Sequence, residues 1–165
     1  MDYNSIVTVN GISGISRGIR VDCGKLLKYL ADDTECRECI SAIAYTTLVP
    51  ANASTNDALV KEIYEDGFIV KHKAGESSID PLLGIEMVMD IVRIACQLEP
   101  DIIVLVSDNP SFAYVTQYIV KELSIRVEVA GFTSEVPEIS SNHIGYINLG
   151  NVLEQIGFIS NSYVH

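Results

Sequence analysis

Residues 101–112 read DIIVLVSDNPSF, and this stretch decides the fold class. Its apolar run, IIVLV, shows no alternation, which is typical of a strand buried on both faces of a parallel sheet. Helical patterns flank the run over residues 80–98 and 111–123. The run then ends in the polar letters SDNPS. In open α/β sheets the carboxyl ends of the strands are the edge where ligands and metals bind.

Short apolar runs and helical patterns alternate along the whole chain. This alternation predicts βαβ units and a mainly parallel sheet of five or six strands with helices on both faces. The predicted strands cover residues 5–9, 40–49, 68–73, 101–107, 125–132 and 145–149. The predicted helices cover residues 21–33, 57–67, 80–98, 111–123 and the terminal stretch NVLEQIGF, 151–158.

Several polar and glycine residues stand where helices begin or end. Asp22 is the expected N-cap of the first helix, and Gly67 follows the second helix at the usual C-terminal position. Asp80 before Pro81 is a strong start signal for the longest helix, and Ser111 is an expected N-cap for the helix after it.

The helix over 80–98 has one apolar set and one polar stripe at helical spacing. The polar stripe favours a solvated face. The stripe consists of Glu86, Asp90, Arg93 and Gln97. The apolar set, which we expect to face the core, consists of Leu82, Ile85, Val88, Ile91, Val92, Ala95 and Leu98.

Length and composition fit one globular domain spanning residues 1–165, with 48% hydrophobic and 20% charged residues. The apolar runs are too short to span a bilayer, and the N-terminal stretch MDYNSIVTVNG shows no export signal. We therefore expect a cytoplasmic protein without a membrane partner.

The net charge of −11 opposes non-specific binding to DNA or RNA, because such binding depends on Lys and Arg displacing counterions from phosphates. A nucleic-acid contact would need a local basic patch. The candidates are Arg17 and Arg20 after the first strand, and Lys71 and Lys73 in the KHK run.

Cys36 and Cys39 form a CxxC spacing between the first helix and the second strand. A structural zinc site needs a second ligand pair, which the sequence lacks. A thioredoxin-like site needs the reverse order, with CxxC at a helix N-terminus. The spacing therefore carries no functional prediction.

Oxygen-bearing side chains gather at two predicted strand ends. Asn10 and Ser13 follow the first strand, and Ser107, Asp108 and Asn109 follow the fourth. Together with Asp80 at a helix start, such ligands suit Mg²⁺ or Mn²⁺, and carboxylates around such an ion can activate water against a phosphodiester. The glycine-rich NGISGISRG offers a different reading, a small phosphorylated ligand, although it is neither a P-loop nor GxGxxG.

The order of these motifs resembles a known family. A strand with Gly-x-x-Asn-like spacing is followed by VDCGKLLKYL, a strand with AYT, the strand GFIVK, a helix after Asp80 and a strand with IVLVS followed by Phe112. This order is similar to the NYN or LabA-like branch of the PIN-like nucleases, over about residues 5–149. The resemblance implies a Rossmann-like three-layer fold in which strand-end aspartates bind Mg²⁺ or Mn²⁺ and RNA is cleaved.

Carried over residue by residue, three aspartates of the family pattern fall on neutral residues, Asn10, Asn109 and Ser111. Asp80 matches the helix-start aspartate, and Glu86 matches the acid six residues later. Ser13 stands where the family has Asn, and Ser107 matches the serine of the family's Ser-Gly-Asp-x-Asp-Phe segment. Asp108 lies one residue before Asn109, the position of the first aspartate of that segment. An enzyme inactivated on purpose would also carry Asn10, but that would not account for Asn109 and Ser111.

The resemblance therefore implies a PIN-like domain that has lost most or all nuclease activity. Amide and hydroxyl groups cannot supply the charge that binds Mg²⁺ or the base that deprotonates water. We expect a binding or regulatory module that acts through self-association, a protein partner or RNA. The opposing hypothesis is a metal-dependent ribonuclease whose atypical site is built from Asp80, Asp108, Asn10 and Asn109.

Overall fold

The computed structural model describes residues 3–10, 19–31, 37–48, 53–74, 81–107, 112–132 and 144–159. Its main sheet has six strands, all parallel, in the order β4-β3-β1-β5-β6-β7. These strands are β1 (Tyr3–Asn10), β3 (Arg37–Leu48), β4 (Ile69–Ala74), β5 (Ile102–Val106), β6 (Arg126–Gly131) and β7 (Ile144–Asn148). The predicted α/β fold with a parallel sheet is confirmed.

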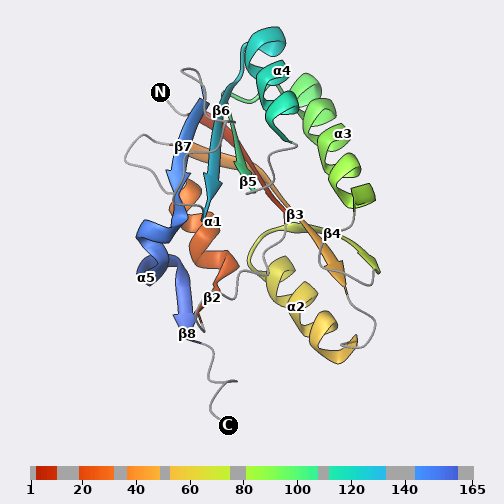
Figure 1. Ribbon diagram of the computed structural model, residues 1–165, viewed down its shortest axis with the longest axis vertical. Coiled ribbons are helices and arrows are strands. Elements are labelled where there is room, and N and C mark those ends of the chain that lie inside the picture. The colour runs from red at the N-terminus through yellow and green to blue at the C-terminus, as the bar shows by residue number, and fades with distance from the viewer. Residues whose placement is uncertain are drawn as a thin grey trace.

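Helices cover both faces of the sheet (Figure 1). On one face lie α3 and α4, and on the other lie α1, α2 and α5. Their bounds are α1 (Cys23–Ala31), α2 (Ala53–Glu65), α3 (Pro81–Leu98), α4 (Ala113–Leu123) and α5 (Leu153–Ile156). The strand order and the two helical layers are those of a Rossmann-like sheet.

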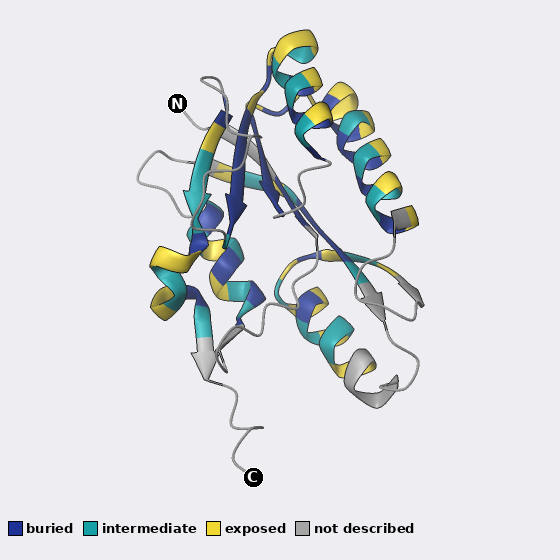
Figure 2. Ribbon diagram, viewed as in Figure 1, coloured by how far each residue is buried: buried dark blue, intermediate teal, exposed yellow. Residues whose placement is uncertain are grey.

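Two apolar clusters separate the sheet from its helical layers, and the central strands are buried on both faces (Figure 2). In β5 every residue from Ile102 to Val106 is buried. Alternate residues of this strand enter opposite clusters, Ile103 and Leu105 beneath α3 and α4, and Val104 beneath α1. The unbroken apolar run in the sequence is explained by this two-sided burial.

The expected helix signals at α1 and α2 are confirmed. Asp22 Oδ1 accepts a hydrogen bond from the Lys25 backbone N–H at 2.9 Å, which is an N-cap contact. Gly67 follows α2 with a φ of +102°, a conformation that side chains with a Cβ rarely adopt.

At α4 the expected cap differs from the structure. The N-cap position is Phe112, which makes no side-chain cap hydrogen bond. Ser111, the predicted cap, and Asp80, the predicted cap of α3, lie outside the described residues.

The predicted core face of α3 is partly wrong, because three of its seven residues point outward. Leu82, Ile85 and Leu98 are exposed, whereas Ile91 and Ala95 are buried as expected, and Val88 and Val92 are partly buried. The helix is turned so that three residues outside the predicted set, Leu83, Met87 and Ile94, also face the sheet. They lie there together with Ile91 and Ala95.

The predicted terminal helix over 151–158 is also corrected. The chain forms a 3₁₀ helix, η3 (Leu149–Val152), then α5, and then a strand, β8 (Gly157–Ile159). Gly157 is extended, with φ −105° and ψ 164°, so the helix ends before it. β8 pairs antiparallel with β2 (Ile19–Val21) in a small second sheet.

No helix within the described residues has both the length and the apolarity of a membrane span.

Candidate functional site

The two predicted site strands, β1 and β5, are neighbours in the sheet, with Val9 paired to Val106. After β1 the chain enters α1 on one face, and after β5 it enters α4 on the opposite face. The strand order therefore reverses between β1 and β5. In sheets of this kind the crevice outside the carboxyl ends at this switch point is the usual ligand site.

Asn10 and Ser107 are the predicted site residues that the sheet brings together. Asn10 is the last residue of β1, and Ser107 directly follows β5. The backbone N–H of Ser107 donates to the carbonyl of Ala130 at 3.0 Å, and the residue is buried. This bond continues the pairing of β5 with β6 by one residue, so it fixes the point at which the chain after β5 leaves the sheet.

The remaining predicted site residues divide into two groups. Glu86 and Lys71 are described on α3 and β4, and the backbones of Arg20 and Lys73 lie in β2 and β4. Outside the described residues lie Ser13, Arg17, Asp80, Asp108, Asn109 and Ser111. The roles assigned to these residues stay predictions.

A buried polar cluster lies beside this strand end, and the sequence interpretation missed it. Tyr45 on β3 pairs in register with Asn10 on one side and with Lys71 of β4 on the other. The Tyr45 hydroxyl donates to Asp90 Oδ2 at 2.9 Å, and Lys71 Nζ donates to the same oxygen. Arg93 Nη2 donates to Asp90 Oδ1 at 2.9 Å. The carboxylate thus binds donors from three different elements, β3, β4 and α3.

Burial and charge act against each other on Asp90. Burial alone raises the pKa of this carboxyl, but the hydrogen bonds from Lys71, Arg93 and Tyr45 favour its charged form and hold its pKa below the usual range. The pKa of Tyr45 is raised strongly, first by burial and then by the neighbouring Asp90 carboxylate. The cluster therefore consists of an ionised aspartate, two cations and a neutral phenol.

The prediction that Asp90 belongs to a solvated stripe is wrong. Asp90 is 7% exposed and lies among the inward residues of α3. Glu86 is partly buried, while Arg93 and Gln97 are exposed. One signal for the buried aspartate was present, because Asp90 falls between Met87 and Ile94 on the inward set.

The Asp90 cluster does not fit a divalent metal. Both carboxylate oxygens already accept hydrogen bonds, and two of the three donors are cations that would repel Mg²⁺ or Mn²⁺. Within the described stretches, no three side chains of His, Cys, Asp or Glu lie close enough together to hold a metal ion.

The fold and the strand-end geometry agree with a sequence comparison. The profile of the NYN domain family matches residues 1–147, so this chain belongs to the NYN domain family. NYN domains are PIN-like nuclease domains. The comparison with curated proteins gave no significant match.

A solved structure shares the fold. A protein of unknown function from Vibrio parahaemolyticus superposes with a TM-score of 0.63, covering 94% of this chain and 96% of that chain, at 19% sequence identity. At this identity the likeness supports the fold alone.

Proposed function

We propose that this NYN domain has lost most or all of the nuclease activity of its family and acts as a binding or regulatory module. The observation that carries the proposal is the position of Asn10. It ends β1 beside β5 at the switch point, where the family resemblance places the first metal-binding aspartate. An amide at this position supplies an oxygen but no negative charge.

The Asp90 cluster supports the same conclusion. Neighbouring parallel strands are about 4.8 Å apart, so Lys71 on β4 lies roughly 10 Å across the sheet from Asn10 on β1. Asn10, Tyr45 and Lys71 lie in register across three strands, and the buried Asp90 carboxylate next to them is neutralised by Lys71 and Arg93. It is therefore not a free base that would take a proton from an attacking water.

A protein partner suits this domain better than a nucleic acid. The chain carries a net charge of −11, and the ammonium group of Lys71 is already paired with Asp90. Binding to phosphates gains most of its free energy from cations that release counterions. Arg17, Arg20 and Lys73 stay the predicted contacts for RNA.

A nuclease assay on single-stranded RNA with Mn²⁺ or Mg²⁺ tests the proposal. We expect the protein to cleave no faster than an Asp80→Ala/Asp108→Ala variant. We expect an Asn10→Asp/Asn109→Asp/Ser111→Asp variant, which restores the three aspartates, to gain metal-dependent cleavage. Metal-dependent cleavage by the unaltered protein that the Asp80→Ala/Asp108→Ala variant lacks would establish the ribonuclease instead.

RNA binding is measured separately from RNA cleavage. We expect fluorescence anisotropy with a labelled RNA to show weak binding at low salt that disappears near physiological salt. Tight binding that is lost in an Arg17→Ala/Arg20→Ala variant would make RNA the ligand.

A further inference from the structure

The outward face of α3 carries an apolar stripe. Leu82, Ile85 and Met89 are 60%, 57% and 66% exposed, and Cys96 is also exposed. The spacing of three, four and seven residues puts them along one line of the helix. We call this set the α3 stripe. Exposed positions make up much of the side of α3 that faces away from the sheet (Figure 2).

The α3 stripe is not needed to bury the helix against the sheet. The opposite side of α3 already fills the core with Leu83, Met87, Ile91 and Ile94. A helix that is apolar on two sides has a second surface to bury. Methionine and aliphatic side chains exposed in a continuous line are typical of an association surface.

Two charged residues border the α3 stripe in a symmetric way. Glu86 and Arg93 lie seven residues apart, and so on the same side of the helix, with Met89 and Asp90 midway between them. If a second copy of α3 lies antiparallel across the stripe, Glu86 of each chain faces Arg93 of the partner subunit. One surface then supplies both halves of two ion pairs, which is the self-complementarity that a twofold interface requires.

Arg93 has donors to spare for such a pair. One of its terminal nitrogens binds Asp90 Oδ1 at 2.9 Å, and its side chain is 55% exposed. A guanidinium carries five N–H donors, so the bond to Asp90 leaves others directed away from it. The contact with Asp90 also holds Arg93 in place before a partner arrives.

We propose that two copies of this chain form a twofold dimer through antiparallel packing of their α3 helices, with the axis passing near Met89. In this arrangement Met89 packs against Met89 of the partner subunit, and Leu82 lies opposite Cys96 of the partner subunit. The dimer does not rest on the loss of nuclease activity, because the α3 stripe faces away from the sheet.

The net charge of −11 on each chain opposes association at long range. Screening reduces this repulsion beyond about 8 Å at physiological salt, while side chains that touch in the interface are within that distance. The contact therefore has to be local and apolar, as the α3 stripe is.

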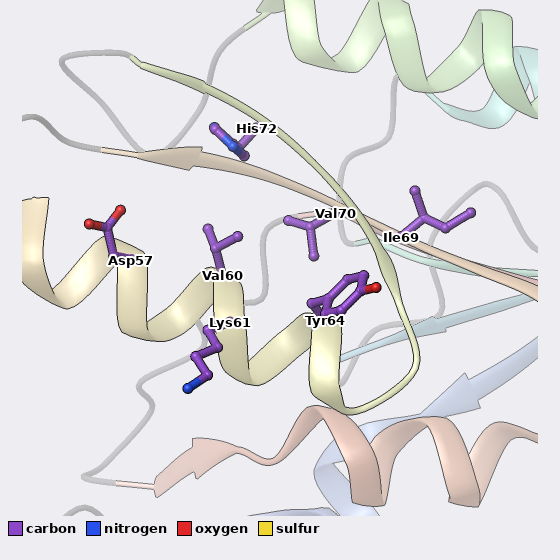
Figure 3. A pocket seen from close by; sticks show the side chains of 7 residues that line it. All are labelled: Asp57, Val60, Lys61, Tyr64, Ile69, Val70 and His72. Carbon is purple, nitrogen blue, oxygen red and sulfur yellow. The ribbon is translucent and has the colours of Figure 1, made fainter.

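The oligomeric state tests the proposal directly. We expect light scattering after size exclusion to give twice the chain mass at about 100 µM, and we expect Met89→Asp to give a monomer with an unchanged circular dichroism spectrum. The control is Tyr64→Asp, because Tyr64 is 70% exposed on α2 (Figure 3), on the other face of the sheet. A monomeric unaltered protein, or a Met89→Asp variant that stays dimeric, would overturn the proposal.

Disulfide trapping tests the antiparallel register. In a Cys36→Ser background, we expect Leu82→Cys to cross-link to the native Cys96 of the partner subunit under mild oxidation, and adding Cys96→Ser to remove the cross-link. The same background without Leu82→Cys is expected to stay uncross-linked, because the axis near Met89 keeps the two Cys96 residues about 20 Å apart along the helices. A cross-link between the two Cys96 residues would show a parallel pair and overturn the antiparallel dimer.

Discussion

The hydroxyl group of Tyr45 donates a hydrogen bond to Asp90 Oδ2 over 2.9 Å, which joins the buried face of β3 to α3. Tyr45 is fully buried and Asp90 nearly so. Because the Tyr45 hydroxyl is shielded from bulk solvent, a lost bond to Asp90 is not replaced by a bond to bulk water. Donors from β3, β4 and α3 meet at the Asp90 carboxylate, so we expect removal of this carboxylate to weaken the packing of α3 on the sheet.

Tyr45→Phe removes one donor from Asp90 and leaves the ring in place. We expect a loss of about 1–2 kcal/mol in the free energy of unfolding, because a hydrogen bond to a charged acceptor is lost in a buried setting. Urea denaturation measures this loss. Tyr64→Phe, on an exposed ring of α2, is the control and should change stability by less than about 0.5 kcal/mol. An equal effect in both variants would contradict the assigned bond.

Asp90→Asn should change how stability depends on pH. The pKa of Asp90 is lower in the folded protein than in the unfolded chain. Its ionised form therefore stabilises the fold above the unfolded value of about 3.9, and this contribution is lost as pH falls through the lower folded value. We expect the stability gap between the two proteins to be widest above about pH 5 and to shrink below about pH 4. Urea titrations at several pH values measure the gap, and one that is constant from neutral to acid pH would contradict the assignment.

Substitutions at two glycines should shift stability in opposite directions. Gly67 has a φ of +102°, so Gly67→Ala should cost about 1 kcal/mol. Gly84 lies inside α3, and nothing comes within 4 Å of an added Cβ. Gly84→Ala should therefore stabilise the protein by roughly 0.5–1 kcal/mol through helix propensity. Thermal denaturation of both variants checks the signs, and a destabilising Gly84→Ala would contradict the space found at that position.

Ile156→Ala tests whether the C-terminal segment belongs to the core. Ile156 is fully buried in the cluster beneath α1, and its carbonyl accepts a hydrogen bond from the Asp22 backbone N–H at 2.8 Å. Removing its side chain should cost about 2–4 kcal/mol, as other large-to-small core changes do. Glu154→Ala, exposed on the same short helix, should cost less than about 0.5 kcal/mol. Similar denaturation midpoints for the two variants would mean that the segment adds little to the core.

The sheet and its site edge were predictable because their signals are local. The unbroken run IIVLV in β5 identifies a strand buried on both faces, and parallel strands bring Asn10 and Ser107 to the same edge. The order of helices and strands then restricts the topology to few choices. The short pair β2 and β8 escaped prediction, because three residues are too few to show a strand period.

The orientation of α3 was not predictable from periodicity. The helix carries two apolar sets, and a buried aspartate lies within the inward one, so the polar residues misidentify the outer face. Asp90 is tolerated inside because Arg93 binds it from the same helix and Lys71 and Tyr45 bind it from other elements. Lys71 and Tyr45 are 19 and 45 positions away in sequence. Such compensation becomes visible only once the chain is folded.

The pairing of β8 with β2 moves the boundary of this domain. The family profile ends at residue 147, but the folded unit continues through η3, α5 and β8 to residue 159. Expression of residues 1–147 alone would remove Leu149 and Ile156 from the cluster that they share with α1. The apolar side of α1 would then be exposed to solvent. Deletion series and domain fusions should therefore keep the chain intact to at least residue 159, the end of β8.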